Sequence, residues 1–229
     1  MESGDVELKA HLTKNVSKRT QRYDLQGAIN DVMSDILVLQ EYTFEGSGTD
    51  HLHVPHGYKV IELPLSGLNE VPPLKHLDGH LSLVVASKFP IRKIKTIRMP
   101  VVKDLARSRF LDLTIDSPLG PFTLIAIHLT TEYLPLSSLN QVAFLGEYIR
   151  RRTQGPLIMA GDHNLWRRAA RLLLPRDLKE SFKQPTWPAQ NPKHQIDHIW
   201  VRGFQTTGEV LPRNGSDHLP VRATISPSN

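Results

Sequence analysis

A short apolar run that ends in polar residues, Pro156-Leu-Ile-Met-Ala-Gly-Asp-His-Asn164, constrains the fold most. Its apolar part predicts a buried strand that ends at Gly161. Residues two apart in an extended segment point to the same side, so Asp162 and Asn164 would form an acceptor–donor pair at the strand end. Open α/β sheets place their binding sites at such ends. Gly-Asp-x-Asn is also a good turn sequence, so a plain turn is the alternative for this motif alone.

The composition suits a globular chain with an anionic partner. Its 229 residues are 39% hydrophobic and 22% charged, which allows a packed core. No apolar run reaches about 18 residues, so we expect no transmembrane helix. The chain has no cysteine and its N-terminus lacks an apolar signal core, which together favour a cytoplasmic location. The net charge of +5 favours nucleic acid or a membrane surface, although ordinary solubility explains such a charge equally well.

Apolar periodicity predicts an alternation of strands and helices. Strands are expected at residues 6–16, 36–41, 58–63, 81–86, 109–116, 122–127, 156–160, 196–201 and 219–225, and helices at residues 22–33, 138–151 and 165–174. Ser138 and Gln141 match a capping box at the start of the second helix, and Leu172 is expected to face inward on the third. No repeat or linker interrupts this order, so residues 1–229 are expected to form a single domain of two sheets covered by helices.

Acidic, amide and imidazole side chains occur where predicted strands end or begin. Those that follow strands are Glu41, His128, Asp162 and Asn164, and those that open or precede strands are Asp197, His198, Asp217 and His218. Each alone has an ordinary explanation as a cap or a solvated turn. Together they are the residue types that a hard divalent cation and a phosphate ester require.

Four motifs, in this order, resemble those of the endonuclease/exonuclease/phosphatase superfamily. They are Glu41 in Leu-Gln-Glu, Gly161-Asp-His-Asn164, Ile196-Asp-His-Ile199 and Ser216-Asp-His-Leu-Pro220. The superfamily includes DNase I-like nucleases, apurinic endonucleases, neutral sphingomyelinases and inositol-phosphate 5-phosphatases, and the resemblance covers nearly the whole chain. It implies an α/β fold, a four-layer α/β sandwich of two packed mixed sheets flanked by helices (DNase I-like).

The resemblance also implies a metal site. Glu41 resembles the family's principal metal-binding glutamate, Asp217 the aspartate that completes the metal neighbourhood, and Asn15 the N-terminal asparagine beside it. Mg²⁺ is the expected cofactor because carboxylate oxygens suit a hard cation. Mn²⁺ is the alternative, since oxygen-rich sites accept both ions.

Catalytic roles are likewise carried over to matching positions. Asp162 and Asn164 look like the pair that positions the attacking water and the phosphate. His218 resembles the general acid/base histidine, with Asp197 as its orienting carboxylate. His128 matches a histidine placed across the phosphate, and Asp78 is a candidate for its carboxylate partner by position only. Whether Asp162 or His218 is the base stays open.

The expected substrate depends on a basic and aromatic segment after the central strand. Trp166, Arg167 and Arg168 lie there, and Arg109 adds charge at the start of a hairpin. Arginines near phosphates give sequence-independent affinity, and an aromatic ring can stack on an exposed base. A second basic run, Arg150-Arg151-Arg152, ends a predicted helix. The alternatives are that Trp166 packs in the core and that this arginine run only stabilises the helix C-terminus.

These observations predict a divalent-metal-dependent phosphodiesterase, a nuclease that hydrolyses DNA by metal-assisted attack of water, with nucleic acid as its partner. An enzyme of the same fold acting on a phospholipid, like a sphingomyelinase, or on a small phosphorylated substrate is the alternative. A non-catalytic binding module is disfavoured because every catalytic position is present. The phosphoinositide branch is disfavoured as well, because its Cys-containing motif is missing.

Overall fold

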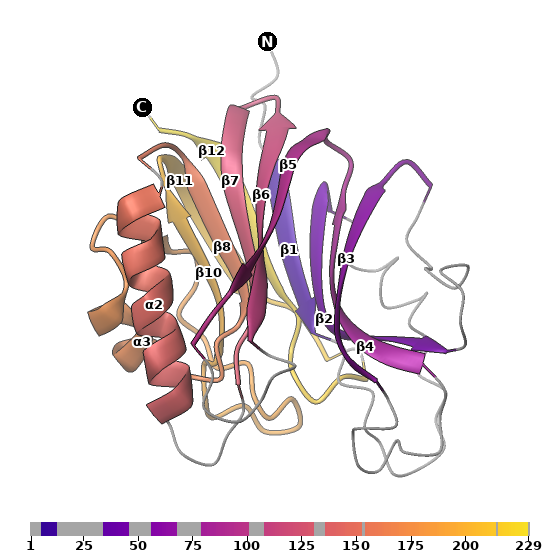
Figure 1. Cartoon of the computed structure of the whole chain (residues 1–229). Coiled ribbons are helices and arrows are strands. Elements are labelled where there is room, and N and C mark those ends of the chain that lie inside the picture. The colour runs from indigo at the N-terminus through magenta and orange to yellow at the C-terminus, as the bar shows by residue number, and fades with distance from the viewer. Residues whose placement is uncertain are drawn as a thin grey trace.

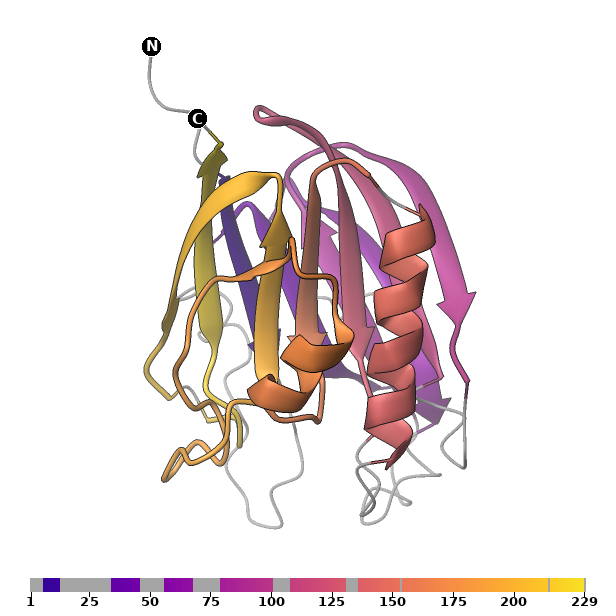
Figure 2. The ribbon, with the colours of Figure 1, turned by 90° about the vertical axis from the view of Figure 1, so that its left-hand side faces the viewer.

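The computed structural model describes residues 6–12, 34–45, 56–67, 79–100, 108–130, 136–152, 154–213 and 215–228. Within them, two six-stranded sheets pack face to face (Figure 1 and Figure 2). The first sheet has the order β11 (Phe204–Val210), β12 (Val221–Pro227), β1 (Val6–Leu12), β2 (Ile36–Glu45), β4 (Gly79–Ser87) and β3 (Lys59–Gly67). The second has the order β5 (Ile91–Arg98), β6 (Arg109–Ser117), β7 (Gly120–His128), β8 (Leu157–Asp162), β10 (Asp197–Arg202) and β9 (Lys179–Glu180).

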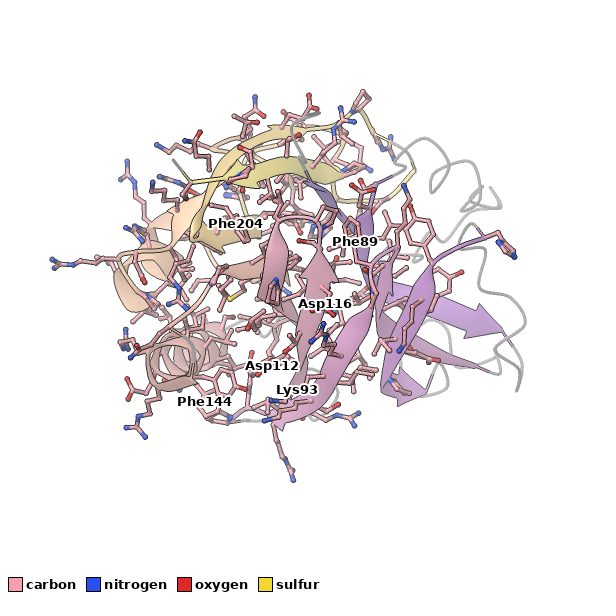
Figure 3. All side chains as sticks on the ribbon, turned by 90° about the horizontal axis from the view of Figure 1, so that it is seen from above. Phe89, Lys93, Asp112, Asp116, Phe144 and Phe204 are labelled. Atoms are coloured by element: carbon pink, nitrogen blue, oxygen red, sulfur yellow. The ribbon has the colours of Figure 1, made fainter. Side chains whose placement is uncertain are left out.

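Alternate residues of the facing strands fill the space between the sheets (Figure 3). On β8, Ile158 and Ala160 point into this space, whereas Leu157 and Met159 point to the helices outside. Strands buried on both faces read as continuous apolar runs, which explains the sequence of β8. Phe204 of the first sheet closes the core with an edge-to-face contact to Phe122 of β7, at 5.9 Å between ring centroids.

Both described helices cover the outer face of the second sheet (Figure 2). α2 (Leu136–Arg152) packs on β7 and β8 through Val142, Leu145 and Ile149, and the shorter α3 (Arg167–Leu173) lies beside it. No helix in the described ranges combines the length and hydrophobicity needed to cross a bilayer. The helix predicted at residues 22–33 lies outside the described residues.

The structure confirms the predicted sandwich of packed mixed sheets and corrects some of its elements. β5 and β11 were not predicted, because each is an edge strand with one exposed face and few apolar residues. The prediction of a capping box at Ser138 is wrong, because α2 begins at Leu136 and Ser138 is buried within the helix. Leu172 was expected to face inward but is 85% exposed.

Ser138 and Gln141 instead anchor the segment that follows β7. The Ser138 hydroxyl donates a hydrogen bond to the carbonyl of Thr130 at 3.0 Å, and the Thr130 amide donates to Oε1 of Gln141 at 3.0 Å. All three residues are buried. The two side chains therefore fix the chain just after His128.

Candidate active site

The topology brings the polar strand ends to one edge of the sandwich. In the second sheet, β7 runs parallel to β8 and β10 runs antiparallel to it, so Asp162 is paired with both His128 and Asp197. In the first sheet, β2 ends near where β12 begins, because β1 is parallel to β2 and antiparallel to β12. Two contacts show that these edges coincide: Nε2 of His128 lies 3.6 Å from Oε1 of Glu41, and Nδ1 of His218 lies 2.9 Å from Oδ2 of Asp197.

Strand alternation turns the side chains of the second sheet inward. Asp162 has the same parity on β8 as Ile158 and Ala160, which belong to the core between the sheets. His128 and Asp197 follow the inward parity of their own strands in the same way. All three are buried, with exposed fractions of 1–2%. Buried charges require partners, so a cluster of this kind indicates a site that a cation or a charged substrate completes.

Glu41 reaches the same space through a β-bulge. Leu39 pairs with Val84 and Tyr42 pairs with Ser82, so two residues of β2 oppose one residue of β4 between them. Glu41 has a φ of 50°, a left-handed conformation that costs a non-glycine residue about 1–3 kcal/mol. Leu39 and Tyr42 both stay on the outer face of the sheet, whereas Glu41 faces His128. The bulge therefore aims this carboxylate at the site.

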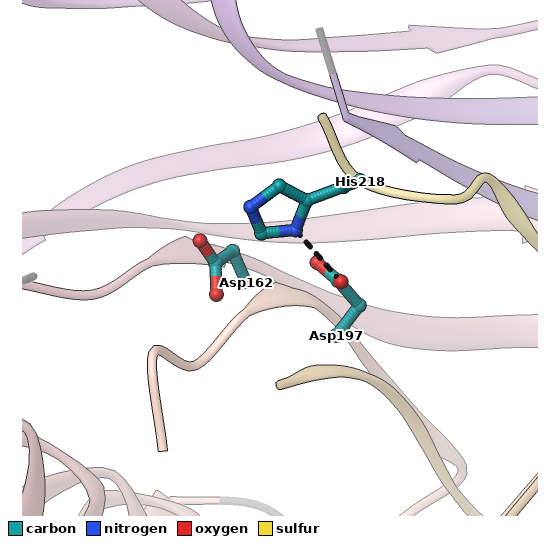
Figure 4. A group of neighbouring side chains, drawn as sticks. All are labelled: Asp162, Asp197 and His218. Atoms are coloured by element: carbon teal, nitrogen blue, oxygen red, sulfur yellow. Dashed lines mark hydrogen bonds and ion pairs between the residues drawn. The ribbon is translucent and has the colours of Figure 1, made fainter. Parts of the chain in front are cut away.

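His218 and Asp197 form a buried hydrogen-bonded pair (Figure 4). Nδ1 of His218 donates to Oδ2 of Asp197 at 2.9 Å. Burial disfavours the charged ring, but the charge and hydrogen bond of Asp197, with the charges of Asp162 and Asp217, outweigh it and raise the pKa of His218 from 6.5 to about 9. Because Asp197 engages Nδ1, Nε2 is the atom at which His218 can exchange a proton with a substrate.

His128 lies between two carboxylates. Its Nε2 is 3.6 Å from Oε1 of Glu41 and 3.7 Å from Oδ2 of Asp162. The contact joins the two sheets, since Glu41 belongs to β2 and Asp162 to β8. Glu41 and Asp162 are the acidic neighbours that the described residues provide for His128, and Asp78 lies outside the described residues.

Asn164 is held in a turn at the end of β8. Its backbone amide donates to Oδ1 of Asp162 at 2.7 Å, and its Nδ2 donates to the carbonyl of Leu129 at 2.8 Å. Its φ of 45° is a conformation that asparagine adopts more readily than most residues. The Leu129 bond uses one of the two N–H groups of the amide. The turn interpretation of Gly-Asp-x-Asn and the site interpretation are therefore compatible, because the turn positions the site residue.

The donor set fits a hard divalent cation. Asp162, Asp197 and His218 each offer one ligand atom, and these atoms lie within 4.8 Å of one another. Oδ1 of Asp197 is buried, and no hydrogen-bond partner for it occurs among the described residues. Carboxylate oxygens at this spacing suit Mg²⁺ or Mn²⁺.

The predicted metal residues, Glu41, Asp217 and Asn15, are not those of the Asp162, Asp197 and His218 group. Oε1 of Glu41 lies 3.6 Å from Nε2 of His128, which in turn lies beside Asp162. Asp217 is half-buried and directly precedes His218, and its carbonyl accepts a hydrogen bond from the amide of Ala189 at 2.7 Å. Asn15 lies outside the described residues. The assignment of Glu41, Asp217 and Asn15 as ligands stays a prediction.

The predicted substrate residues separate into exposed and engaged side chains. Trp166 is 67% exposed, so the core alternative is wrong for this residue, and Arg168 is also exposed. Arg167 is bound to the buried carboxylate of Glu180. Arg109 begins β6 at the same edge as His128, because β6 and β7 are antiparallel, and its guanidinium donates to the carbonyl of Pro64 on β3.

The arginine run at the end of α2 lies away from the site. Arg150 and Arg151 both bind Glu147 on the same helix. The helix ends shortly before β8 begins, whereas the site lies where β8 ends. The helix C-terminus interpretation therefore suits Arg150 and Arg151 better than phosphate binding does.

A buried polar group behind the site was missed by the sequence analysis. His163 is fully buried, and burial together with the neighbouring His198 holds its pKa well below 6.5, so the ring is neutral. Nδ1 of His198 lies 2.8 Å from Oε1 of Glu180, and its Nε2 lies 3.2 Å from the carbonyl oxygen of Leu165. Glu180 also binds Arg167. The group links the end of β8, β9, β10 and α3 behind Asp162 and Asp197, and the only sequence signal for it was the place of His198 in Ile-Asp-His.

Gly161→Ala is expected to destabilise the fold by roughly 3 kcal/mol or more. A Cβ at Gly161 would meet the carbonyl oxygen of Ile127 at 2.0 Å, and its φ is 142°. The strand ends that carry His128 and Asp162 would have to separate. Urea unfolding measures the effect, and Gly155→Ala is the matched control because its Cβ would meet nothing within 4 Å. Equal stability of the two variants would contradict the close approach of β7 and β8.

Comparison with known proteins agrees with the fold. One solved structure that superposes on the chain is an endonuclease/exonuclease/phosphatase from Beutenbergia cavernae, with 18% identity, a TM-score of 0.69, and coverage of 98% of this chain and 72% of that one. Another is a D. rerio TDP2 humanized by 14 mutations, with 15% identity, a TM-score of 0.75, and coverage of 98% of this chain and 100% of that one. A truncated Caenorhabditis elegans TDP2 is similar as well (17%, 0.70, 97% and 97%). At these identities the likeness concerns the fold, and it confirms the predicted DNase I-like architecture.

The family comparison covers almost the whole chain. No curated protein sequence matches it. The model of the Endonuclease/Exonuclease/phosphatase family matches residues 4–218, a range that includes every residue of the site described above. The chain therefore belongs to the endonuclease/exonuclease/phosphatase family.

Proposed function

We propose that the protein is a divalent-metal-dependent phosphodiesterase, a nuclease that hydrolyses phosphodiester bonds in DNA. The observation that carries the proposal is the buried cluster of Asp162, Asp197 and His218, with His128 and Glu41 completing it across the two sheets. Membership of the family supports a hydrolase, and enzymes of this family use divalent metal ions. Residues 1–229 would act as one catalytic domain, since β1 near the N-terminus pairs with β12 near the C-terminus.

The residues of the site have complementary tasks in this proposal. A bound Mg²⁺ or Mn²⁺, held by Glu41 and Asp217, would neutralise charge on the phosphate. Asp197 keeps the ring of His218 in one orientation and leaves Nε2 to exchange a proton with the reacting groups. Asn164 is positioned by the Asp162 and Leu129 bonds to donate to a phosphate oxygen.

His128 and Asp162 complete the catalytic set. His128 is held between Glu41 and Asp162, where a protonated ring would donate to the phosphate. Asp162 keeps Oδ1 on the amide of Asn164, which fixes the direction of the carboxylate. The low-dielectric surroundings of these buried groups strengthen such interactions.

Nucleic acid is favoured over a phospholipid by the exposed groups beside the site. Trp166 and Arg168 are both exposed and lie two and four residues after Asn164 in the sequence. A cationic side chain and an exposed aromatic ring in one short segment suit a polyanion with bases. A phosphodiesterase that acts on a phospholipid is the second candidate, because an exposed tryptophan also suits the membrane interface.

Cleavage of supercoiled plasmid tests the proposal. We expect nicking with Mg²⁺ or Mn²⁺, and we expect EDTA to abolish it. Failure to cleave plasmid, single-stranded DNA and RNA with either metal, from protein shown to be folded, would contradict the nuclease assignment. Hydrolysis of sphingomyelin vesicles under the same conditions would then favour the phospholipid candidate.

Arg168→Ala is expected to weaken DNA binding uniformly across sequences and to reduce the magnitude of the salt slope by about one, because each phosphate contact releases about one counterion. Binding isotherms over a range of salt concentrations measure this slope. Arg151→Ala is the matched control, since Arg151 is exposed but lies at the far end of β8 from the site. An unchanged slope in Arg168→Ala would show that Arg168 contacts no phosphate.

A further inference from the structure

Three aromatic rings form a ladder from the surface to the catalytic histidine. Trp166 stacks on His194 with ring centroids 6.2 Å apart and planes 19° apart, and His194 stacks on Trp187 at 6.0 Å and 29°. Trp187 in turn lies 6.4 Å from the ring of His218. We refer to Trp166, His194 and Trp187 as the aromatic ladder. Its inner end touches the site, and its outer end is open to solvent.

The ladder is fixed to the segment that carries His218. Trp187 and His194 form an antiparallel bridge, with each amide donating to the carbonyl of the other at 2.9–3.0 Å. The amide of Leu219 donates to the carbonyl of Thr186 at 2.8 Å, which ties this hairpin to the chain next to His218. The ladder therefore keeps its position relative to the catalytic ring.

Trp166 lies on the surface and adds little to the core. Its ring is 67% exposed, although the residue lies directly before α3 and follows the buried Leu165. Its side chain makes no capping hydrogen bond to the helix. An exposed indole gains little from the hydrophobic effect, so its position at the mouth of a ladder that leads to the site indicates a ligand.

We propose that Trp166, the exposed outer ring of the aromatic ladder, binds an unpaired nucleobase of a strand whose phosphate is held at the site. This inference rests on the proposed nuclease function and names its substrate class as single-stranded or frayed DNA. Stacking requires a base with a free face, and bases inside a duplex are already covered by their neighbours. Arg168 lies two residues after Trp166, and Lys193 lies directly before His194. Both cations are exposed, and their charge suits the phosphate backbone of such a strand.

The test separates stacking from charge by using two oligomers of equal length. One is oligothymidylate and the other is an abasic deoxyribose-phosphate chain with the same charge and no bases. Binding is measured in Mg²⁺ in a His218→Ala background, in which cleavage is expected to be slow. We expect oligothymidylate to bind roughly five- to hundredfold more tightly than the abasic chain.

Adding Trp166→Ala should remove most of this difference and leave the affinity for the abasic chain unchanged. Leu172→Ala is the matched control, because Leu172 is an 85% exposed apolar residue near the opposite end of α3 from Trp166. It should alter neither affinity. Unfolding by urea should show Trp166→Ala to be as stable as its background.

Other outcomes overturn the inference in distinguishable ways. Equal affinity for the two oligomers, or an equal loss of both in Trp166→Ala, would overturn base stacking while the nuclease proposal stands. Binding to phosphatidylcholine vesicles that Trp166→Ala abolishes, with oligomer affinity unchanged, would assign the ring to a lipid surface instead. Absence of binding to either oligomer would overturn this inference, whereas the nuclease proposal falls only if plasmid cleavage also fails.

Discussion

His218→Ala is expected to lower the rate of phosphodiester cleavage by about 10²–10⁴-fold, the usual contribution of a positioned acid or base. The variant removes the ring whose Nδ1 is held by Asp197 and whose Nε2, in the proposed mechanism, exchanges a proton with the reacting groups. Single-turnover cleavage of a labelled oligonucleotide measures the loss. His56→Ala is the matched control, because His56 is exposed and precedes β3 at the end of the sheet opposite Glu41. Its activity should equal that of the natural chain.

A double-mutant cycle tests whether Asp197 acts through His218. Groups that act as a unit are strongly non-additive, so Asp197→Ala with His218→Ala should be no slower than His218→Ala alone. Additive losses would show that Asp197 has a separate task, and direct binding of the metal is the one that its buried Oδ1 suggests. Activity of His218→Ala close to that of His56→Ala would remove His218 from the catalytic set.

Glu41→Ala and Glu41→Gly are both expected to lower activity by about 10²–10³-fold, because a carboxylate that holds a catalytic cation supplies several kcal/mol of charge stabilisation. The loss should be accompanied by a higher metal concentration for half-maximal activity. Metal titrations of cleavage measure both effects. Glu147→Gln is the control, since this half-exposed carboxylate lies on α2 and binds only neighbouring arginines among the described side chains.

The two Glu41 variants should differ in stability although both are inactive. Glycine fits a φ of 50° without strain, whereas alanine does not, so Glu41→Gly should be more stable than Glu41→Ala by about 1 kcal/mol. Urea unfolding of the two proteins measures the difference. A more stable Glu41→Ala would mean that the bulge at Gln40–Glu41 relaxes once the carboxylate is gone, and that the carboxylate itself holds the strained turn.

Much of the architecture follows from local patterns along the chain. Strands such as β8 and the β6–β7 hairpin have apolar runs or alternation that depend only on neighbouring residues. The edge strands β5 and β11 were not predicted from the sequence, because each buries only one face and has a largely polar sequence. The capping-box prediction failed because the side chains of Ser138 and Gln141 bind the backbone of Thr130. Thr130 precedes the helix, so these bonds do not cap the helix end.

The sequence by itself determined that His128 and Asp162 end strands and that Asp197 begins one, because strand boundaries depend on neighbouring residues. Glu41 was expected at a strand end, but β2 continues past it to Glu45. The sequence also placed Asp217 and His218 just before the last strand. Motif order then indicated the family, which the match over residues 4–218 shows.

Only the tertiary structure decided how these side chains meet. The place of His128 between Glu41 and Asp162 and the aromatic ladder both join segments far apart in sequence. The contact of Asp197 with His218 also joins distant segments, and before the structure it was expected only through the family resemblance. Such contacts depend on strand register and on the packing of one sheet against the other, which a single sequence does not encode locally. The bulge that turns Glu41 inward is of the same kind, because an extra residue in β2 has meaning only against its partner β4.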